Sequence, residues 1–279
     1  MPSRPQRGVI DIFADAFTLD LHRALVEQLP EALELLSPIP LIQANLEPLG
    51  DERGVYQLFE RGESVYIGKS ELPLARRLDQ HRRRCAGRLN INIGDMAFRC
   101  LYVDRFVDAA SPERILIEKY RAQGLAPWNV EEGFAPRDVG RNRDRGKPGQ
   151  WFVDRPADYE AVVAVRGGER VLPLMSALHH LKDAVPFDLF RYAHPTRSHD
   201  PRDRADASDY SDRTLTLGSD PQPVIAHLKS IVGVLPVGWQ ATVLPHGVIV
   251  YKEAHDYDYA LAGWRRTETG VEALPPGTR

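Results

Sequence analysis

GVYQLFERGESVYIG, residues 54–68, is the stretch of sequence that decides the fold of the first half of the chain. It contains two short runs rich in β-branched and aromatic residues, with a glycine-containing break between them, which is typical of a β-hairpin. A three-residue loop, 60–62, would place Gly62 where a positive φ is needed. The sequence therefore predicts two antiparallel strands joined by this loop.

The predicted loop also sets which side chains lie opposite each other. It pairs Phe59 with Glu63, so Tyr56 faces Tyr66. Directly opposed residues project from the same face, and two phenols should then stand side by side at the edge of the sheet. Paired aromatic side chains are also common in ordinary packing, so this pair alone indicates no function.

The segments around the hairpin complete a small α/β unit. Residues 73–86 have helical periodicity, 97–106 form a predicted strand, and 111–120 open a second helix. Upstream, 16–36 carries apolar residues at helical spacing, which predicts one or two helices interrupted at Pro30. The fold class is therefore α+β, with a hairpin and a third strand flanked by helices.

The helix after the hairpin has a mixed inward face. Leu74, Leu78, His81 and Cys85 follow the spacing of one face, and Arg77 lies one turn before His81. A lone histidine on such a face is more often a hydrogen-bonded core residue than a catalyst. A partly buried guanidinium needs an anion, however, and this favours a functional site.

The second helix brings a carboxylate inward. Glu113, Leu116, Ile117 and Tyr120 share one face, whereas Glu118 points about 140° away, at roughly 100° per residue. An acid in the first helical turn is also explained by the helix dipole alone. An inward carboxylate near arginines and phenols remains a good ligand for a hard metal ion.

Composition and charge set broad limits. The chain has 279 residues, a net charge of −3 and 43% hydrophobic residues, enough for a globular core. No apolar run resembles a secretory signal or a membrane span, so a cytoplasmic protein without a membrane partner is expected. Cys85 and Cys100 are too few for a disulfide framework and too far apart for a zinc knuckle, which predicts two reduced thiols.

Positive charge is concentrated in two segments, although the chain as a whole is slightly acidic. Clustered arginines are typical of phosphate binding, whereas either cluster alone could be a solvated surface. The residues we assign to DNA binding are Arg82, Arg83, Arg84 and Arg88 in the first segment, and Arg141, Arg143, Arg145 and Lys147 in the second.

The predicted division of the chain has five parts. They are an N-terminal helical segment (1–48), the hairpin-containing core with its arginine-rich loop (49–157), an extension (158–193), a linker or mobile loop (194–213) and a small C-terminal α/β segment (214–279). In the last part, 215–217 is a predicted strand, 224–234 a helix, and QATVLPHGVIVYK (240–252) a hairpin turning at residues 245–247.

The order of several short motifs resembles the GIY-YIG nuclease superfamily. These motifs are GVY (54–56), VYIGKS (65–70), Arg77 with His81, Glu113 followed by Leu116 and Ile117, and PWN (127–129). The similarity extends over roughly residues 11–157 to the small restriction endonucleases of this superfamily that cut CCGCGG-type sites. Two features depart from that branch: the hairpin is shorter, and RAQGLA (121–126) adds residues that make Glu118 a second candidate metal ligand.

The resemblance implies a catalytic set and a metal. One divalent cation, Mg²⁺ with Mn²⁺ as a substitute, would be held by Glu113 and would bind the scissile phosphate. Arg77 would neutralise the phosphoryl oxygens, and Asn129 would hold the geometry at the end of the second helix, where a simple turn residue is the alternative.

The resemblance leaves the general base open among Tyr56, Tyr66 and His81. A phenol titrates near pH 10, and lowering its pKa by about three units requires roughly 4 kcal/mol, which Lys69 or the metal could supply. His81 titrates near 6.5 without help and could take the proton itself.

The expected function is that of a type II restriction endonuclease. It would hydrolyse phosphodiester bonds in double-stranded DNA at a GC-rich palindrome, as a homodimer, because one active site cuts one strand. The alternatives are another GIY-YIG DNA endonuclease, of the homing, repair or toxin kind, and a catalytically inactive DNA-binding protein.

Overall fold

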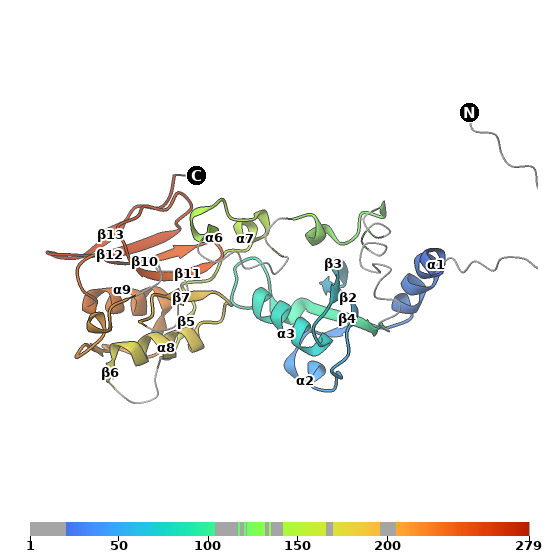
Figure 1. The fold of residues 1–279 in the computed structure, drawn as a ribbon, viewed down its shortest axis with the longest axis horizontal. Coiled ribbons are helices and arrows are strands. Elements are labelled where there is room, and N and C mark those ends of the chain that lie inside the picture. Colours follow the sequence, from blue (N-terminus) through green and yellow to red (C-terminus); the bar gives the residue numbers. More distant parts are fainter. Residues whose placement is uncertain are drawn as a thin grey trace, which may run out of the picture.

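The computed structural model describes residues 21–103, 117, 120, 122–131, 134, 142–165, 170–195 and 205–278. Two units lie at opposite ends of an elongated chain, one around a four-stranded sheet and one around a five-stranded sheet (Figure 1). The mixed α+β class is confirmed. No helix of the described part is long and apolar enough to cross a membrane.

The N-terminal unit is an antiparallel sheet between helices. Its sheet order is β1-β4-β2-β3. The elements are α1 (Leu21–Glu34), β1 (Ile39–Pro40), α2 (Gln43–Leu46), β2 (Gly54–Glu60), β3 (Glu63–Ser70), α3 (Leu74–Cys85), η1 (Ile93–Asp95), β4 (Met96–Tyr102), η2 (Pro127–Asn129) and α7 (Gln150–Asp154). The short helix α6 (Asn142–Arg145) lies against the C-terminal unit instead, where Asp144 contacts His246 and Tyr251 (Figure 1).

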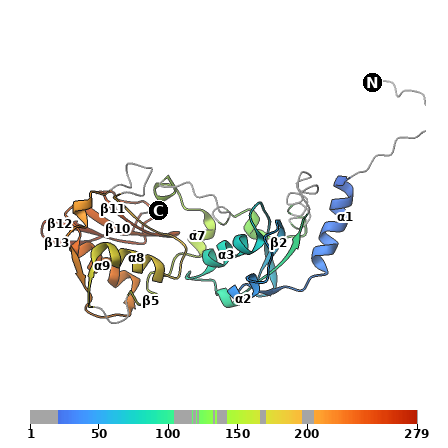
Figure 2. The same ribbon diagram turned by 60° about the horizontal axis from the view of Figure 1, so that its bottom comes forward.

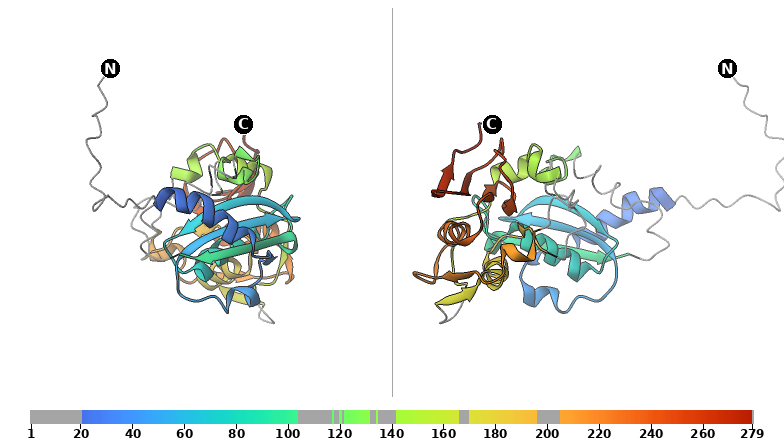
Figure 3. Two further views of the ribbon diagram at one scale, coloured as in Figure 1. Left: turned by 90° about the vertical axis from the view of Figure 1, so that its right-hand side faces the viewer. Right: turned by 60° about the vertical axis from the view of Figure 1, so that its left-hand side comes forward.

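Helices α1 and α3 cover opposite faces of this sheet. Side chains of β2 and β3 alternate between the two faces, so Tyr56 packs with α3 residues such as Leu78, whereas Val55 packs with α1 residues such as Leu33. Figure 2 shows α3 beside the sheet, and the left view of Figure 3 shows α1 crossing it. The predicted interruption of the first helix at Pro30 is wrong, because α1 continues through that residue.

The predicted hairpin is confirmed, but its predicted register is wrong. Arg61 and Gly62 alone form the turn, with φ of 52° and 84°, so Glu60 rather than Phe59 pairs with Glu63. Positive φ at both central residues is typical of the two-residue turn whose twist matches that of the strands.

The two phenols still share a face, although they are not directly opposed. Tyr56 pairs with Gly68 and Leu58 pairs with Tyr66, and the register shifts between Leu58 and Phe59. Tyr56 and Tyr66 are therefore diagonal neighbours, with ring centroids 6.1 Å apart. Gly68 opposite Tyr56 leaves the space that its ring occupies.

The C-terminal unit is built on a sheet of order β13-β12-β10-β11-β7, in which β7 is parallel to β11 and the other pairs are antiparallel. Helices α8 and α9 pack with this sheet in one core. The elements are β5 (Val162–Val163), β6 (Val171–Pro173), α8 (Leu174–Ala184), β7 (Phe190–Tyr192), η4 (Ala207–Asp209), β8 (Thr214–Thr216), β9 (Gln222–Pro223), α9 (Val224–Val234), β10 (Trp239–Leu244), β11 (Gly247–Lys252), β12 (Ala262–Thr267) and β13 (Gly270–Leu274).

The predicted helix 224–234 is confirmed as α9, and the predicted hairpin as β10–β11. Its turn is one residue shorter than the predicted 245–247, because Gly247 already pairs with Leu244. One hydrophobic core combines residues from 157 to 264, so the predicted extension and the C-terminal segment pack together. The described end of the predicted linker also belongs to this core, since Tyr210 is 7% exposed.

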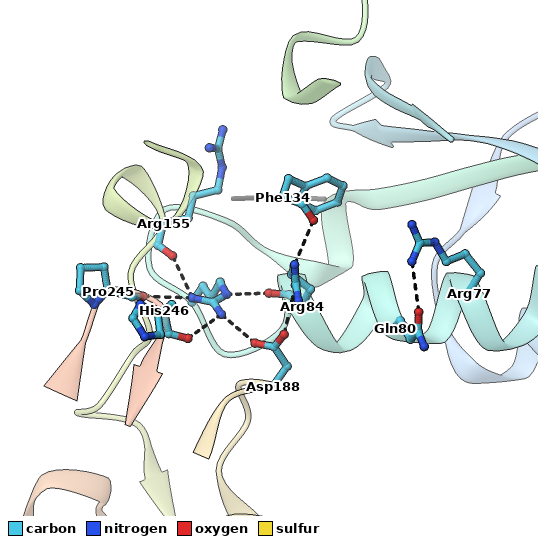
Figure 4. Close-up of polar contacts among 9 residues, drawn as sticks. Arg77, Gln80, Arg84, Phe134, Arg155, Asp188, Pro245 and His246 are labelled. Carbon is cyan, nitrogen blue, oxygen red and sulfur yellow. Dashed lines mark hydrogen bonds and ion pairs between the residues drawn. The ribbon is translucent and has the colours of Figure 1, made fainter. Parts of the chain in front are cut away.

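A buried arginine joins the two units. The side chain of Arg88, just after α3, is 0% exposed, and burial lowers its pKa while Asp188 of the C-terminal unit raises it. Its N–H groups donate five hydrogen bonds of 2.6–3.3 Å, to the Asp188 carboxylate and to the backbone oxygens of Arg84, Arg155, Pro245 and His246 (Figure 4). Arg84 also pairs with Asp188, at 3.1 Å. The C-terminal unit therefore fixes the end of α3.

Candidate active site

The hydroxyl of Tyr56 is the centre of the candidate site. Arg77 Nε donates to this oxygen at 3.0 Å, and His81 Nε2 lies 2.7 Å from it. Tyr56 comes from β2, and the two other residues come from consecutive turns of α3. The predicted inward face of α3 is confirmed, since Leu74, Leu78, His81 and Cys85 are all buried.

Aromatic rings enclose the histidine. The His81 ring lies 5.4 Å from the Tyr66 ring and stacks on Phe134 at 4.9 Å, with 23° between the planes. Phe134 and Tyr66 are themselves in edge contact, at 4.8 Å. His81 is only 1% exposed, and it contacts solvent-accessible space through a pocket on the α3 side.

Burial keeps His81 neutral. Burial of the imidazole is the largest cause that lowers the pKa of His81 well below 6.5. The positive charges of Arg77 and Arg84 lower this pKa further. The neutral imidazole faces the phenol through Nε2, 2.7 Å from Tyr56 Oη. A tautomer with its proton on Nδ1 can accept the Tyr56 proton at Nε2.

The neutral histidine predicts acid sensitivity of the fold. In the unfolded chain the pKa of His81 is near 6.5, so below that pH the unfolded state binds a proton at this residue that the folded state does not bind. The free energy of unfolding should fall as pH drops below about 6.5, by at most about 1.4 kcal/mol per pH unit for this residue. His227, whose pKa burial also lowers, adds a second contribution. Urea unfolding from pH 7.5 to 5 should show a shallower pH dependence in His81→Gln, and identical slopes would contradict the assignment.

Gly68 is required by the Tyr56 ring. A Cβ at this position would lie 2.5 Å from Tyr56 Cζ and 2.9 Å from Tyr66 Cε1. Gly68→Ala should therefore displace the phenol from His81 and destabilise the protein by about 1–3 kcal/mol, as overpacking does. The matched control is Gly218→Ala, where a Cβ meets nothing within 4 Å, and it should change stability by less than about 0.5 kcal/mol. Equal urea midpoints for the two variants would be the contrary result.

Asn129, the last residue of η2, joins this segment to the hairpin. Its Oδ1 accepts from Ile67 N at 2.8 Å, and its Nδ2 donates to Ile67 O at 2.7 Å. Strand β3 is at the edge of its sheet, so the outward N–H and C=O of Ile67 lack a neighbouring strand there. The amide side chain supplies both missing partners and fixes the backbone between Tyr66 and Gly68.

Lys69 does not approach the Tyr56 hydroxyl from the same face. It pairs with Val55, which packs on the α1 side of the sheet, and alternation therefore directs Lys69 away from α3. Its Nζ lies 2.8 Å from a Glu71 carboxylate oxygen. Among the described contacts, the cation that donates to the phenol is Arg77.

The predicted metal ligand Glu113 and its alternative Glu118 lie outside the described residues. So do Arg141 and the side chain of Arg143. Among the residues that are described, no group of three or more His, Cys, Asp or Glu side chains could hold a metal ion.

The remaining predicted DNA-binding residues differ in accessibility. Arg83, Arg145 and Lys147 are exposed, Arg82 is half-buried, and Arg84 is 19% exposed and held by Asp188. The predicted DNA-binding role of Arg88 is wrong. Its guanidinium is fully buried, each of its nitrogens donates to a protein oxygen, and its role is structural.

Sequence reasoning missed Phe134 and Asp188. Phe134 stacks on His81, and its carbonyl oxygen accepts from Arg84 Nη1 at 3.0 Å. Asp188 is separated from Arg84 by 104 residues, so no local pattern signals their contact. Phe134 is a single phenylalanine after PWN (127–129), and no sequence pattern around it predicts a contact with His81.

The arrangement defines a class of site, a phenol between a guanidinium and a neutral imidazole, on a hairpin and the following helix. Such a site can bind an anion and transfer a proton beside it. No protein-family model matches the chain, and no curated protein matches it either.

Proposed function

We propose that this chain is a metal-dependent DNA endonuclease of the GIY-YIG kind, and that it acts as a type II restriction enzyme on GC-rich palindromic sites. The observation that carries the proposal is the contact of Tyr56 Oη with both Arg77 Nε and His81 Nε2. These three residues belong to the motifs on which the resemblance rests.

Arg77 is suited to a phosphate. A guanidinium has five N–H donors, and in this site Nε donates to Tyr56 and Nη1 donates to Gln80 at 3.3 Å. The rest of the fork can donate to phosphoryl oxygens, where charge develops during hydrolysis. Arg77 would thus hold the phosphate beside the phenol.

The hydrogen-bond order supports a proton relay. An attacking water forms the new P–O bond and gives its proton to Tyr56 Oη, while the original Tyr56 proton passes to His81 Nε2. The bond from phosphorus to the leaving oxygen breaks, and that oxygen takes a proton from solvent. His81 must be neutral to act in this way, and its lowered pKa meets that condition. A bound phosphate would offset the two guanidiniums and make His81 more basic.

The proposed metal depends on Glu113. The phenol contacts a guanidinium and an imidazole in the described part of the chain, and the carboxylate that the sequence offers for a metal is Glu113. A divalent cation bound there would supply Lewis-acid charge to the phosphate. Single-carboxylate sites that keep several waters suit Mg²⁺.

Plasmid cleavage tests the proposal directly. Purified protein with Mg²⁺ should give discrete DNA fragments, and sequencing of their ends should reveal a palindrome. Glu113→Ala should give none. Cleavage without a palindromic site would favour another GIY-YIG endonuclease, whereas DNA binding without cleavage in Mg²⁺ or Mn²⁺ would favour the inactive DNA-binding protein.

A further inference from the structure

Two adjoining pockets form a groove that leads from the candidate site to the C-terminal unit. The smaller, of about 260 Å³, is lined by Gln80, His81, Arg83, Arg84 and Asp188. The larger, of about 490 Å³, lies between α3 and residues 182–190 and shares Arg83 and Asp188 with the first. We call the two together the α3–α8 groove.

The α3 side of the groove carries excess positive charge. Asp79 is shared by Arg82 and Arg83, each at 2.7 Å, and Asp188 is shared by Arg84 and Arg88. Each carboxylate can neutralise only one of its two guanidiniums. Burial is the main cause that lowers the pKa of His81, and the charges of Arg77 and Arg84 beside the groove lower it further.

The C-terminal unit adds a cation of its own. Lys182, in the last turn of α8, is exposed and lines the larger pocket together with Arg82 and Arg83. Asp183 lines the same pocket, so the excess positive charge of the groove comes from the arginines of α3. The buried side chains of Phe187 and Phe190 also line the larger pocket. A long polyanion that has one phosphate at Arg77 could continue past His81 toward Lys182.

We propose that the α3–α8 groove binds the sugar–phosphate backbone of duplex DNA beside the scissile phosphate, with Arg83 and Lys182 each contacting a phosphate. The inference rests on the proposed function, and it gives the C-terminal unit a role in substrate binding. Arg84 and Arg88 hold the groove together through Asp188 rather than contacting DNA.

Salt-dependent binding without divalent metal tests the groove separately from catalysis. Fluorescence anisotropy with a 30-base-pair GC-rich duplex gives Kd between 50 and 200 mM salt. Lys182→Gln and Arg83→Gln should each weaken binding several-fold and reduce the slope of log K against log salt by about 0.9, and the double variant by roughly 1.8. The matched control is Arg61→Asn, an exposed cation paired with Asp95 outside both pockets, whose asparagine suits the local φ of 52°.

The outcomes separate the two proposals. Unchanged slopes in both single variants, or no DNA binding by the wild-type protein, would overturn the groove. A loss of slope in Arg61→Asn equal to that in Lys182→Gln would also overturn it, because the effect would then be one of net charge. If the variants show reduced slopes but the wild-type protein cuts no DNA, the groove proposal stands and the nuclease proposal is rejected.

Discussion

Asp188→Ala is expected to destabilise the protein by about 3–5 kcal/mol, because it leaves a fully buried guanidinium without its counter-ion. Arg88 is 0% exposed and donates to Asp188 at 2.8 Å, and Arg84 shares the same carboxylate. The packing of both units keeps the Arg88 guanidinium buried in the variant, so its desolvation cost remains. Loss of the carboxylate removes only the favourable attraction between Asp188 and Arg88. Urea unfolding at pH 7.5 measures the effect.

Two variants serve as controls for Asp188→Ala. Asp188→Asn keeps an oxygen acceptor for Arg88 and should lose less stability than alanine. Asp256→Ala breaks an ion pair of similar length, 2.9 Å to Arg265, but Asp256 is 80% exposed, so a change of only about 0–1 kcal/mol is expected. Equal losses for Asp188→Ala and Asp256→Ala would show that Arg88 is not held as described.

Arg77→Ala should lower the single-turnover rate of DNA cleavage by about 10³-fold or more. In the proposed mechanism the substitution removes the charge that faces the developing phosphoryl charge, and arginines in that role are worth about 10³–10⁵. It also removes the hydrogen bond from Arg77 Nε to Tyr56 Oη, the atom that contacts His81 Nε2. Because Arg77 is only partly buried, the free energy of unfolding should change much less than in Asp188→Ala.

Neighbouring substitutions show whether the loss belongs to Arg77 itself. Arg76→Ala removes an equal charge from the exposed side of α3 and should keep the rate within about tenfold. Tyr56→Phe removes the relay and should cost about 10²–10⁴-fold. A rate for Arg77→Ala within tenfold of the wild type would contradict the proposed mechanism.

Local pattern predicted the elements around the site, and it failed where two turns were both allowed. The face of α3 containing Leu78 and His81 followed from helical spacing alone. The hairpin register did not, because nothing in the sequence excludes positive φ at Arg61. The site nevertheless keeps both phenols on one face, since the shift near Leu58 restores the alternation.

Contacts between distant segments could not be predicted. Charge alone makes Arg83 and Arg88 alike, yet one is exposed and the other is enclosed by backbone oxygens of residues 155 and 245. The difference depends on how the C-terminal unit meets α3. Similarly, Phe134 has no helical or strand pattern that would place it on His81.

The amide of Asn129 has a consequence for how this protein behaves at high concentration. By occupying both backbone groups of Ile67, it closes a stretch of β3 to which a strand from another molecule could otherwise add. An open border of this kind is a common starting point for intermolecular sheets. The side chain that shapes the hairpin of the candidate site therefore also covers this part of the sheet edge.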